Sequence, residues 1–237
     1  ALVGKNHYIG GRELKLEDII KKRRTSSQLT EVDVLAAGFP CQAFSIAGYR
    51  KGFDDDRGNV FFNIRDLIKF LKRNRKPPQA LLLENVKNFK GHDKGKTFQI
   101  VCKEIQKRGY SIFHKVLNTA IYTDIPQNRE RIFIICFKDE KDWEFIGKPT
   151  VSSHSNMLFP PQPSHSRKSI REMLEKGKVD DKYYYDETKY MYDELKEHMK
   201  SRDTVYQWRR IYVRANKSNM CPTLTANMGT GGHNVPL

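Results

Sequence analysis

The sequence predicts an α/β fold, in which a sheet of buried strands packs on amphipathic helices, followed by a second, smaller region. Short apolar runs bounded by Gly, Pro or Asn alternate over residues 32–137 with stretches in which apolar residues recur every three or four positions. Beyond them, prolines lie among Ser, His and Gly, which indicates a linker or irregular loop. The composition then becomes basic and aromatic, so a separate region begins there.

The first half of the predicted sheet has a strand on each side of a helix. Residues 32–37 form an apolar run that ends at Gly38, and ALLLENV, residues 80–86, forms another after two prolines. Apolar residues at spacings of three and four indicate the helix between them: Val60, Phe61, Ile64, Leu67, Ile68 and Leu71.

The second half continues this alternation. Phe98, Val101 and Ile105 mark another helix, which Gly109 can end. Residues 111–117 alternate like a strand, TDIPQNRE interrupts the pattern, and RIFIICF is typical of a further buried strand. We expect the last pair of strands to be antiparallel. In the smaller region, SIREMLEK and YYYDETKYMYDELKEHMK predict short helices, and the basic, aromatic TVYQWRRIYVR follows.

The overall composition bounds the function. Lys and Arg number 43 against 28 Asp and Glu, a formal net charge of +15. This charge favours a polyanionic partner, although a solvated basic surface is the alternative. No apolar run approaches the roughly 18 residues of a membrane span, so we expect no membrane partner. The 4 cysteines form no C-x-x-C pair, which indicates neither a zinc site nor a disulfide framework and favours a reducing cytoplasm.

Two predicted strands end in reactive groups. GFPCQ places Cys41 just past the end of the first strand, and ENV places Glu84 at the end of the second. In open α/β sheets the active crevice lies at the carboxyl ends of the strands, so neighbouring strands would bring the thiol and the carboxyl to one cleft. Cys102 and Cys136 lie on apolar faces, as inert packing cysteines do, whereas the polar, basic loop around Cys41 favours an exposed thiolate.

Four segments, in order and spacing, resemble the motifs of the DNA (cytosine-5)-methyltransferase family of the bacterial restriction-modification type. They are GFPCQAFSIAG, ENVKNF, QNRERIFIICF and CPTLTANMGTGGHNVPL. The resemblance runs from about Asp18 onward. It implies a Rossmann-like, S-adenosylmethionine-dependent methyltransferase sheet over residues 1–140, a target-recognition region over 141–220, and the start of a segment returning to the catalytic domain over 221–237. A bacterial cytoplasm, with the nucleoid reached through DNA, is the implied location.

The resemblance also assigns catalytic roles. Carbon 5 of cytosine becomes reactive only after a nucleophile adds to ring carbon 6, and Cys41 would be that nucleophile. Glu84 would hydrogen-bond ring nitrogen 3, while Arg129 and Arg131 would hold a base oxygen and a phosphate. The alternatives are a surface carboxylate for Glu84 and, for the arginines, a charge pair that deters pairing at a strand edge. The family needs no metal, and FDDDRG lacks the spacing of a calcium loop, so we expect no metal site.

Duplex DNA is the implied partner, with the target cytosine flipped out of the stack. The loop after Cys41 resembles the family's active-site lid and can meet phosphates. In the recognition region, arginine and glutamine side chains can read base edges, although they can equally position phosphates around a core Trp208. The candidate DNA-binding residues are Gln42, Ser45, Arg57, Gln207, Arg209, Arg210 and Thr223.

The cofactor implied by the resemblance is S-adenosylmethionine. Asp18, Phe39 and Pro40 correspond to one wall of its site, and a surface helix charge is the alternative for Asp18. The family's F-x-G-x-G loop and its final G-N-S/A-V segment are not found in these residues. We therefore expect flanking segments or a second chain to complete the site. A catalytically silent DNA-binding relative and an RNA cytosine-5 methyltransferase are the rival functions.

Overall fold

A computed structural model describes residues 6–9, 12–15, 32–39, 59–73, 77–138, 151–152, 159–164, 168–209, 212–216, 220–224 and 235–237. The chain divides into two compact units. Unit 1 comprises residues 1–117 and 131–161, and unit 2 comprises residues 118–130 and 162–237. Cys41 and six other predicted site residues lie outside the described residues: Asp18, Pro40, Gln42, Ser45, Arg57 and Arg210.

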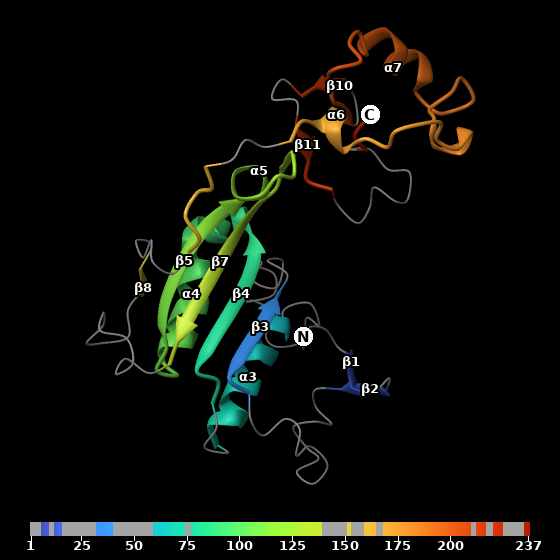
Figure 1. The fold of residues 1–237 in the computed structure, drawn as a ribbon. Coiled ribbons are helices and arrows are strands. Elements are labelled where there is room, and N and C mark those ends of the chain that lie inside the picture. The colour runs from blue at the N-terminus through green and yellow to red at the C-terminus, as the bar shows by residue number, and fades with distance from the viewer. Residues whose placement is uncertain are drawn as a thin grey trace. The chain divides into compact units, whose positions relative to one another are not determined.

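A five-stranded sheet forms the centre of unit 1, with the strand order β3-β4-β7-β5-β8 (Figure 1). The bounds are Val34–Gly38 for β3, Ala80–Val86 for β4, Ser111–Asn118 for β5, Glu130–Phe137 for β7 and Val151–Ser152 for β8. Strand β3 runs parallel to β4, and β4 runs antiparallel to β7. The predicted strands are thus confirmed. The last predicted strand, β7, lies between β4 and β5. It pairs antiparallel with β4, the strand that carries Glu84.

One face of this sheet is covered by two helices, α3 (Asn59–Arg73) and α4 (Lys96–Gln106). Both lie on the same side of the sheet in Figure 1. The 3-10 turns η4 (Lys87–Lys90) and η5 (His92–Gly95) lead from β4 into α4. The apolar spacing predicted both helices, and the core that they bury includes Phe61, Ile64, Leu67, Ile68, Leu71, Val101 and Ile105.

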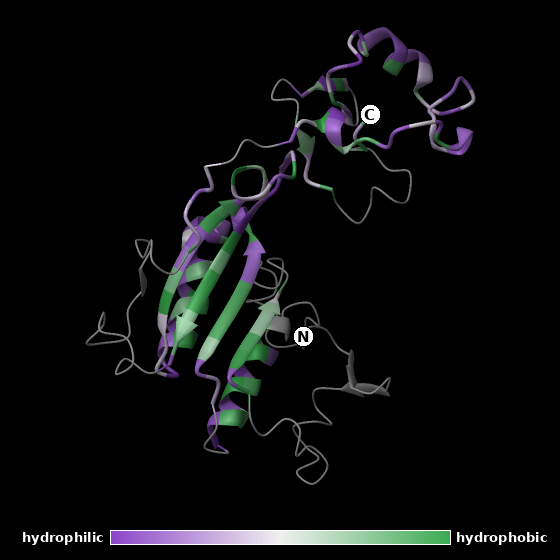
Figure 2. Cartoon of the chain, viewed as in Figure 1, coloured by the Kyte–Doolittle hydropathy of each residue, from purple (hydrophilic) through white to green (hydrophobic). Residues whose placement is uncertain are grey.

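Alternation along β4 shows how this core is built. Leu81, Leu83 and Asn85 point to the buried face, and the residues between them point to the opposite face. That opposite face is partly open, with Leu82 40% exposed. In Figure 2 the strand is mostly green and its tip turns purple where the polar residues begin. The carboxyl end of β4 is therefore a polar edge on an apolar sheet.

Unit 2 has short elements. Helix α5 (Thr119–Tyr122) and strand β6 (Gln127–Asn128) follow β5, and β6 pairs in parallel with β11 (Cys221–Pro222). Helices α6 (Ile170–Met173) and α7 (Tyr192–His198), with the 3-10 turn η6 (Asp181–Tyr183), confirm the short helices predicted from the sequence. Strands β9 (Tyr206–Arg209) and β10 (Tyr212–Ala215) form an antiparallel hairpin.

In unit 1, a further antiparallel hairpin joins β1 (Asn6–Ile9) to β2 (Arg12–Lys15). Among the helices that the structure describes, none has both the length and the apolar character to cross a membrane.

Candidate active site and nucleic-acid interface

The ends of β3 and β4 meet as the sequence analysis predicted. The parallel register places Gly38 opposite Glu84. Parallel neighbours present their carboxyl ends at the same edge of a sheet, so the segment that leads to Cys41 leaves beside Glu84. This confirms that the two strands are neighbours, while the position of the Cys41 thiol itself lies outside the described residues.

Asn85 fixes the backbone just before Pro40 and Cys41. Its side chain is 3% exposed, and its Nδ2 donates a hydrogen bond of 2.6 Å to the carbonyl oxygen of Phe39. Its Oδ1 accepts a bond of 2.8 Å from the backbone N–H of Val86. Sequence analysis gave Asn85 no role. The sequence signal for such a role was its position in the alternation of β4, which places Asn85 on the buried face. A polar residue on the buried face of a strand needs a hydrogen-bond partner.

Glu84 is held by an arginine from the neighbouring strand. The Nε atom of Arg131 lies 2.9 Å from Oε1 of Glu84, and the two side chains are 17% and 37% exposed, respectively. The register places Arg131 opposite Val86, so the pair is a diagonal contact on one face of the sheet. Because each partner is fixed to an interior strand, the orientation of the carboxyl follows from the register of the sheet.

Gly38 makes room for this carboxyl. A Cβ atom at position 38 would lie 3.2 Å from Oε2 of Glu84, closer than ordinary van der Waals contact. The absence of a side chain at Gly38 therefore lets the carboxyl lie against the end of β3. One oxygen of Glu84 contacts Arg131 and the other lies beside the β3 backbone, an arrangement that can present a hydrogen-bonding group to a bound base.

Arg129 lies in unit 2, where its backbone is tied to α5. Its carbonyl oxygen accepts a bond of 3.0 Å from the N–H of Thr119, and its own N–H donates to Oδ1 of Asn118 at 3.2 Å. Nearby, the Thr223 hydroxyl donates to the carbonyl oxygen of Asn128 at 2.8 Å. The structure therefore brings Glu84 together with Arg131, while the side-chain roles predicted for Arg129 and Thr223 stay predictions.

Phe39 is the one predicted cofactor residue that the structure describes. Its ring is 5% exposed and packs against Phe61 and Phe89, with centroid separations of 5.5 and 5.3 Å. This ring is part of the core, and no cradle for S-adenosylmethionine is evident among the described residues.

The two packing cysteines are buried, as the sequence predicted. Burial raises the pKa of the Cys102 thiol to about 12 and that of Cys136 well above its ordinary value. Burial also raises the pKa of Cys221. These thiols are therefore protonated at neutral pH and poor nucleophiles.

The β9–β10 hairpin carries the recognition candidates. Gln207 is 2% exposed, Arg209 is half-buried, and Arg214 is exposed opposite Gln207. The Nη2 atom of Arg214 donates a hydrogen bond of 2.8 Å to Oε1 of Gln207. Trp208 is half-buried on the other face of the hairpin, with its ring centroid 5.3 Å from that of Tyr190. Sequence analysis did not single out the Gln207–Arg214 pair, which only the strand register reveals.

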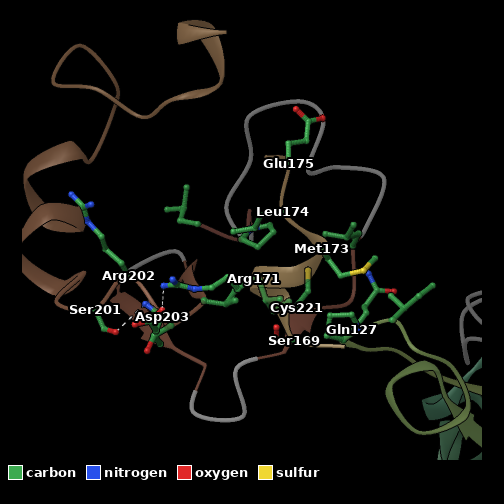
Figure 3. A pocket seen from close by; sticks show the side chains of 18 of the residues that line it. Gln127, Ser169, Arg171, Met173, Leu174, Glu175, Ser201, Arg202, Asp203 and Cys221 are labelled. Carbon is green, nitrogen blue, oxygen red and sulfur yellow. Dashed lines mark hydrogen bonds and ion pairs between the residues drawn. The ribbon is translucent and has the colours of Figure 1, made fainter. Parts of the chain in front are cut away.

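A cavity of about 850 Å³ lies within unit 2, and Figure 3 shows its lining. Apolar side chains such as Met173 and Leu174 form much of its wall, and Arg171 forms an ion pair with Asp203 at its edge. On α7, Glu194, Glu197 and His198 could bring one ligand atom each within 4.8 Å of one another. These groups are largely exposed, and within the described part of the chain nothing else around them indicates a metal.

Comparison with known proteins defines the class. The model of the C-5 cytosine-specific DNA methylase family matches residues 5–236, and the chain belongs to this family. This confirms the resemblance seen in the motifs.

Two relatives show how much of a whole enzyme the chain represents. The type II methyltransferase M.Bsp6I of Bacillus sp. (strain RFL6) is 46% identical over 230 residues, which cover 95% of this chain and 64% of the relative. M.HaeII of Haemophilus aegyptius is 49% identical over 125 residues, which cover 52% and 37% of the two chains. The chain thus spans less than two thirds of either relative. The crystal structure of S. pombe Dnmt2 methyltransferase matches with a TM-score of 0.44 at 20% identity, covering 66% of this chain and 42% of that one.

Proposed function

We propose that the protein carrying this chain is a DNA (cytosine-5-)-methyltransferase. It transfers a methyl group from S-adenosylmethionine to carbon 5 of a cytosine flipped out of a specific duplex sequence. The observation that carries the proposal is the meeting of β3 with β4, which joins the segment leading to Cys41 to the Glu84–Arg131 pair. Family membership and the net charge of +15 support duplex DNA as the substrate.

The proposed chemistry uses Cys41 as the nucleophile. Its thiolate forms a bond to ring carbon 6, and the electron pair of the 5,6 double bond becomes available at carbon 5. S-adenosylmethionine, when bound, supplies the methyl group that carbon 5 accepts. Loss of the proton from carbon 5 and departure of the thiolate then restore the aromatic ring.

Glu84 stabilises the attacked ring in this proposal. Addition at carbon 6 increases electron density at ring nitrogen 3, and a carboxyl that shares a proton there favours the adduct. Arg131 keeps that carboxyl oriented through its contact of 2.9 Å. Such preorganisation matters because the donor need not be reoriented during the reaction.

A covalent-trap experiment tests the proposal. The full-length protein is incubated with S-adenosylmethionine and a random-sequence duplex library in which 5-fluorocytosine replaces cytosine. Fluorine at carbon 5 cannot leave as a proton does, so the enzyme should remain bonded to DNA through denaturing electrophoresis. Sequencing the trapped duplexes also gives the recognition site.

Matched variants give the experiment its specificity. Cys41→Ser should abolish the adduct while specific DNA binding stays within a few-fold of wild type. Cys221→Ser alters another thiol and should still form it. An adduct with the Cys41→Ser variant would exclude Cys41 as the nucleophile. Preference for an RNA library would favour the RNA cytosine-5 methyltransferase alternative. DNA binding by the wild type without any adduct would favour the catalytically silent DNA-binding relative.

A further inference from the structure

One face of the β9–β10 hairpin gathers side chains suited to a nucleic acid. Directly opposite residues in an antiparallel pair share a face, and alternate residues along each strand do so too. The register pairs Arg209 with Tyr212 and Gln207 with Arg214, so these four side chains lie on one face. Tyr212 is 50% exposed and Arg214 is exposed, whereas Gln207 is 2% exposed.

Part of the opposite face packs against the rest of unit 2. Tyr206 is 4% exposed, and its hydroxyl accepts a bond of 3.0 Å from the N–H of Ser201. Trp208 contacts the ring of Tyr190. A backbone bridge between Gln207 and Pro236 adds support along the edge of β9. The hairpin is thus anchored at Tyr206 and along the edge of β9, and it presents Tyr212 and Arg214 on the other face.

The hydrogen bond of 2.8 Å between Arg214 and Gln207 sets the direction of the guanidinium. It uses one N–H of the five that a guanidinium carries. Because the amide is uncharged, the pair keeps the full positive charge of Arg214. Because Gln207 is buried and fixed to an anchored strand, it can hold this charge in one orientation. A surface arginine without such a partner loses more side-chain entropy on binding.

We propose that Arg214 reads a guanine in the recognition sequence and that Gln207 is its positioning residue, rather than a base-contacting residue itself. This inference rests on the proposed function for its substrate. A two-stranded ribbon fits the major groove, and an oriented guanidinium donates to both O6 and N7 of guanine. A buried amide at position 207 cannot reach a base edge without displacing Arg214, whereas the exposed guanidinium already lies on the presented face.

The test uses the full-length protein and a recognition site selected from the random-sequence duplex library by gel shift, which does not require the adduct. Dissociation constants are measured by gel shift for that site and for each single-base variant of it, at two salt concentrations. Arg214→Ala should lose discrimination at one G·C pair by about 10- to 100-fold and retain it at the other positions. A loss shared equally by all sequences, with a reduced salt slope, would show a phosphate contact and overturn the inference.

The Gln207 variants test positioning separately from packing. Gln207→Leu should lose discrimination at the same base pair. Gln207→Glu retains an acceptor oxygen and should restore most of the discrimination, with a lower overall affinity because the added carboxylate offsets the charge of Arg214. The double variant of Gln207→Leu and Arg214→Ala should be no worse than Arg214→Ala alone, since the amide acts through the arginine. If both Gln207 variants lose discrimination at every base pair of the site and also have lowered thermal stability, the role of Gln207 is merely structural. Arg202→Ala, an exposed arginine outside the hairpin, is the control.

Failure of this inference is distinguishable from failure of the proposed function. The 5-fluorocytosine adduct depends on Cys41, and gel-shift discrimination does not. If the wild type forms the adduct and Arg214→Ala discriminates normally, this inference alone is overturned. If no adduct forms but Arg214→Ala loses discrimination at one base pair, the specificity role of Arg214 is supported and the proposed methyl transfer is overturned. If the wild type shows no sequence-specific binding to DNA, both fall.

Discussion

Two arginines in this protein pair with a residue on a neighbouring strand, and the pairs differ in the chemistry of that partner. Arg131 contacts the carboxyl group of Glu84 at 2.9 Å, so the partner in unit 1 is acidic. Arg214 contacts the amide of Gln207 at 2.8 Å, so the pair in unit 2 remains cationic. The difference fits the proposed roles. Arg131 would orient an acidic group that acts on an uncharged base, and the pair of Arg214 with Gln207 would keep its positive charge for a polyanion.

The supports of the two pairs differ as well. Glu84 lies on β4, which has β3 on one side and β7 on the other. Arg214 lies on a two-stranded hairpin that is anchored by Tyr206 and Trp208. Changes at the first pair should therefore affect the rate of reaction on a stable scaffold, while changes at the second should affect the choice of sequence.

The largest effect is expected from Glu84→Gln. The amide keeps the shape of the carboxyl but cannot share a proton with the base, so the turnover number should fall by about 10²- to 10⁴-fold. DNA affinity should stay within a few-fold. Single-turnover methyl transfer and gel shifts separate the two quantities.

Glu104→Gln is the matched control. Glu104 also contacts an arginine, Arg108, at 3.1 Å, but Glu104 lies on α4 and Arg108 just after this helix, away from the carboxyl ends of β3 and β4. A pair of this kind contributes about 1 kcal/mol or less, and turnover should be unchanged. Equal loss of rate in both variants would mean that Glu84 acts through stability rather than through chemistry.

Asn85→Ala should have the next largest effect. It removes a buried donor from the carbonyl of Phe39 and an acceptor from the N–H of Val86. Leaving such groups unpaired costs about 1–3 kcal/mol, which denaturant unfolding should detect. Because the bond fixes the backbone that precedes Cys41, turnover should fall about tenfold or more, as expected for a displaced nucleophile.

The exposed Asn88, only a few residues further on, provides the comparison for Asn85. Asn88→Ala leaves the bond to Phe39 in place, so stability and turnover should both be close to wild type. If Asn85→Ala lowers stability but leaves turnover intact, the bond to Phe39 serves the fold and not the nucleophile.

A smaller effect is expected from Gly38→Ala. The new Cβ would lie 3.2 Å from Oε2 of Glu84, so the carboxyl must shift by a few tenths of an ångström. The turnover number should fall by about tenfold or less, since larger displacements near 1 Å cost about 10²-fold. Gly91→Ala is the control, because its Cβ would have 4.0 Å to the nearest atom. Equal rates for both variants would show that Glu84 tolerates displacement.

Much of the first region could be predicted from the sequence, because short apolar runs and helical spacing report burial directly. The strand ALLLENV has the predicted bounds, and its carboxyl end carries Glu84 as expected. The partner of Glu84 was harder to predict. Arg131 was expected near a base, whereas the contact with Glu84 arises from the antiparallel register of β7 on β4, which the sequence does not encode locally.

The second region was less predictable for a related reason. TVYQWRRIYVR looked like a set of separate base-reading candidates, and its fold as a hairpin depends on a turn without a strong local signal. Gln207 is buried, and its backbone bridges to Pro236, a residue distant in the sequence. Burial that depends on such distant contacts cannot be inferred from the spacing of residues along one segment.

The smallest effect concerns acidity, and it should be larger in the first region than at the β9–β10 hairpin. His114 lies on β5, is 7% exposed, and packs edge-on against Phe98 at 4.9 Å. Burial, followed by the nearby positive charge of Lys90, lowers the pKa of His114 below its ordinary 6.5. The neutral ring is therefore the form that the fold favours. Its contribution to stability is complete above pH 6.5 and is lost as the pH falls through the lowered pKa.

Hydrogen exchange at several pH values between 7 and about 5 should reveal this contribution, once rates are corrected for the intrinsic effect of pH. Amides of β5 and its neighbours should lose protection as the pH falls, whereas those of β9 and β10, where an amide and a guanidinium form the central pair, should change less. His114→Phe keeps an aromatic ring against Phe98 and removes the titrating group, so it should flatten the acid dependence in unit 1. If acid weakened β5 equally in the wild type and in this variant, His114 would not be the source, and the two regions would not differ in the way that their buried groups indicate.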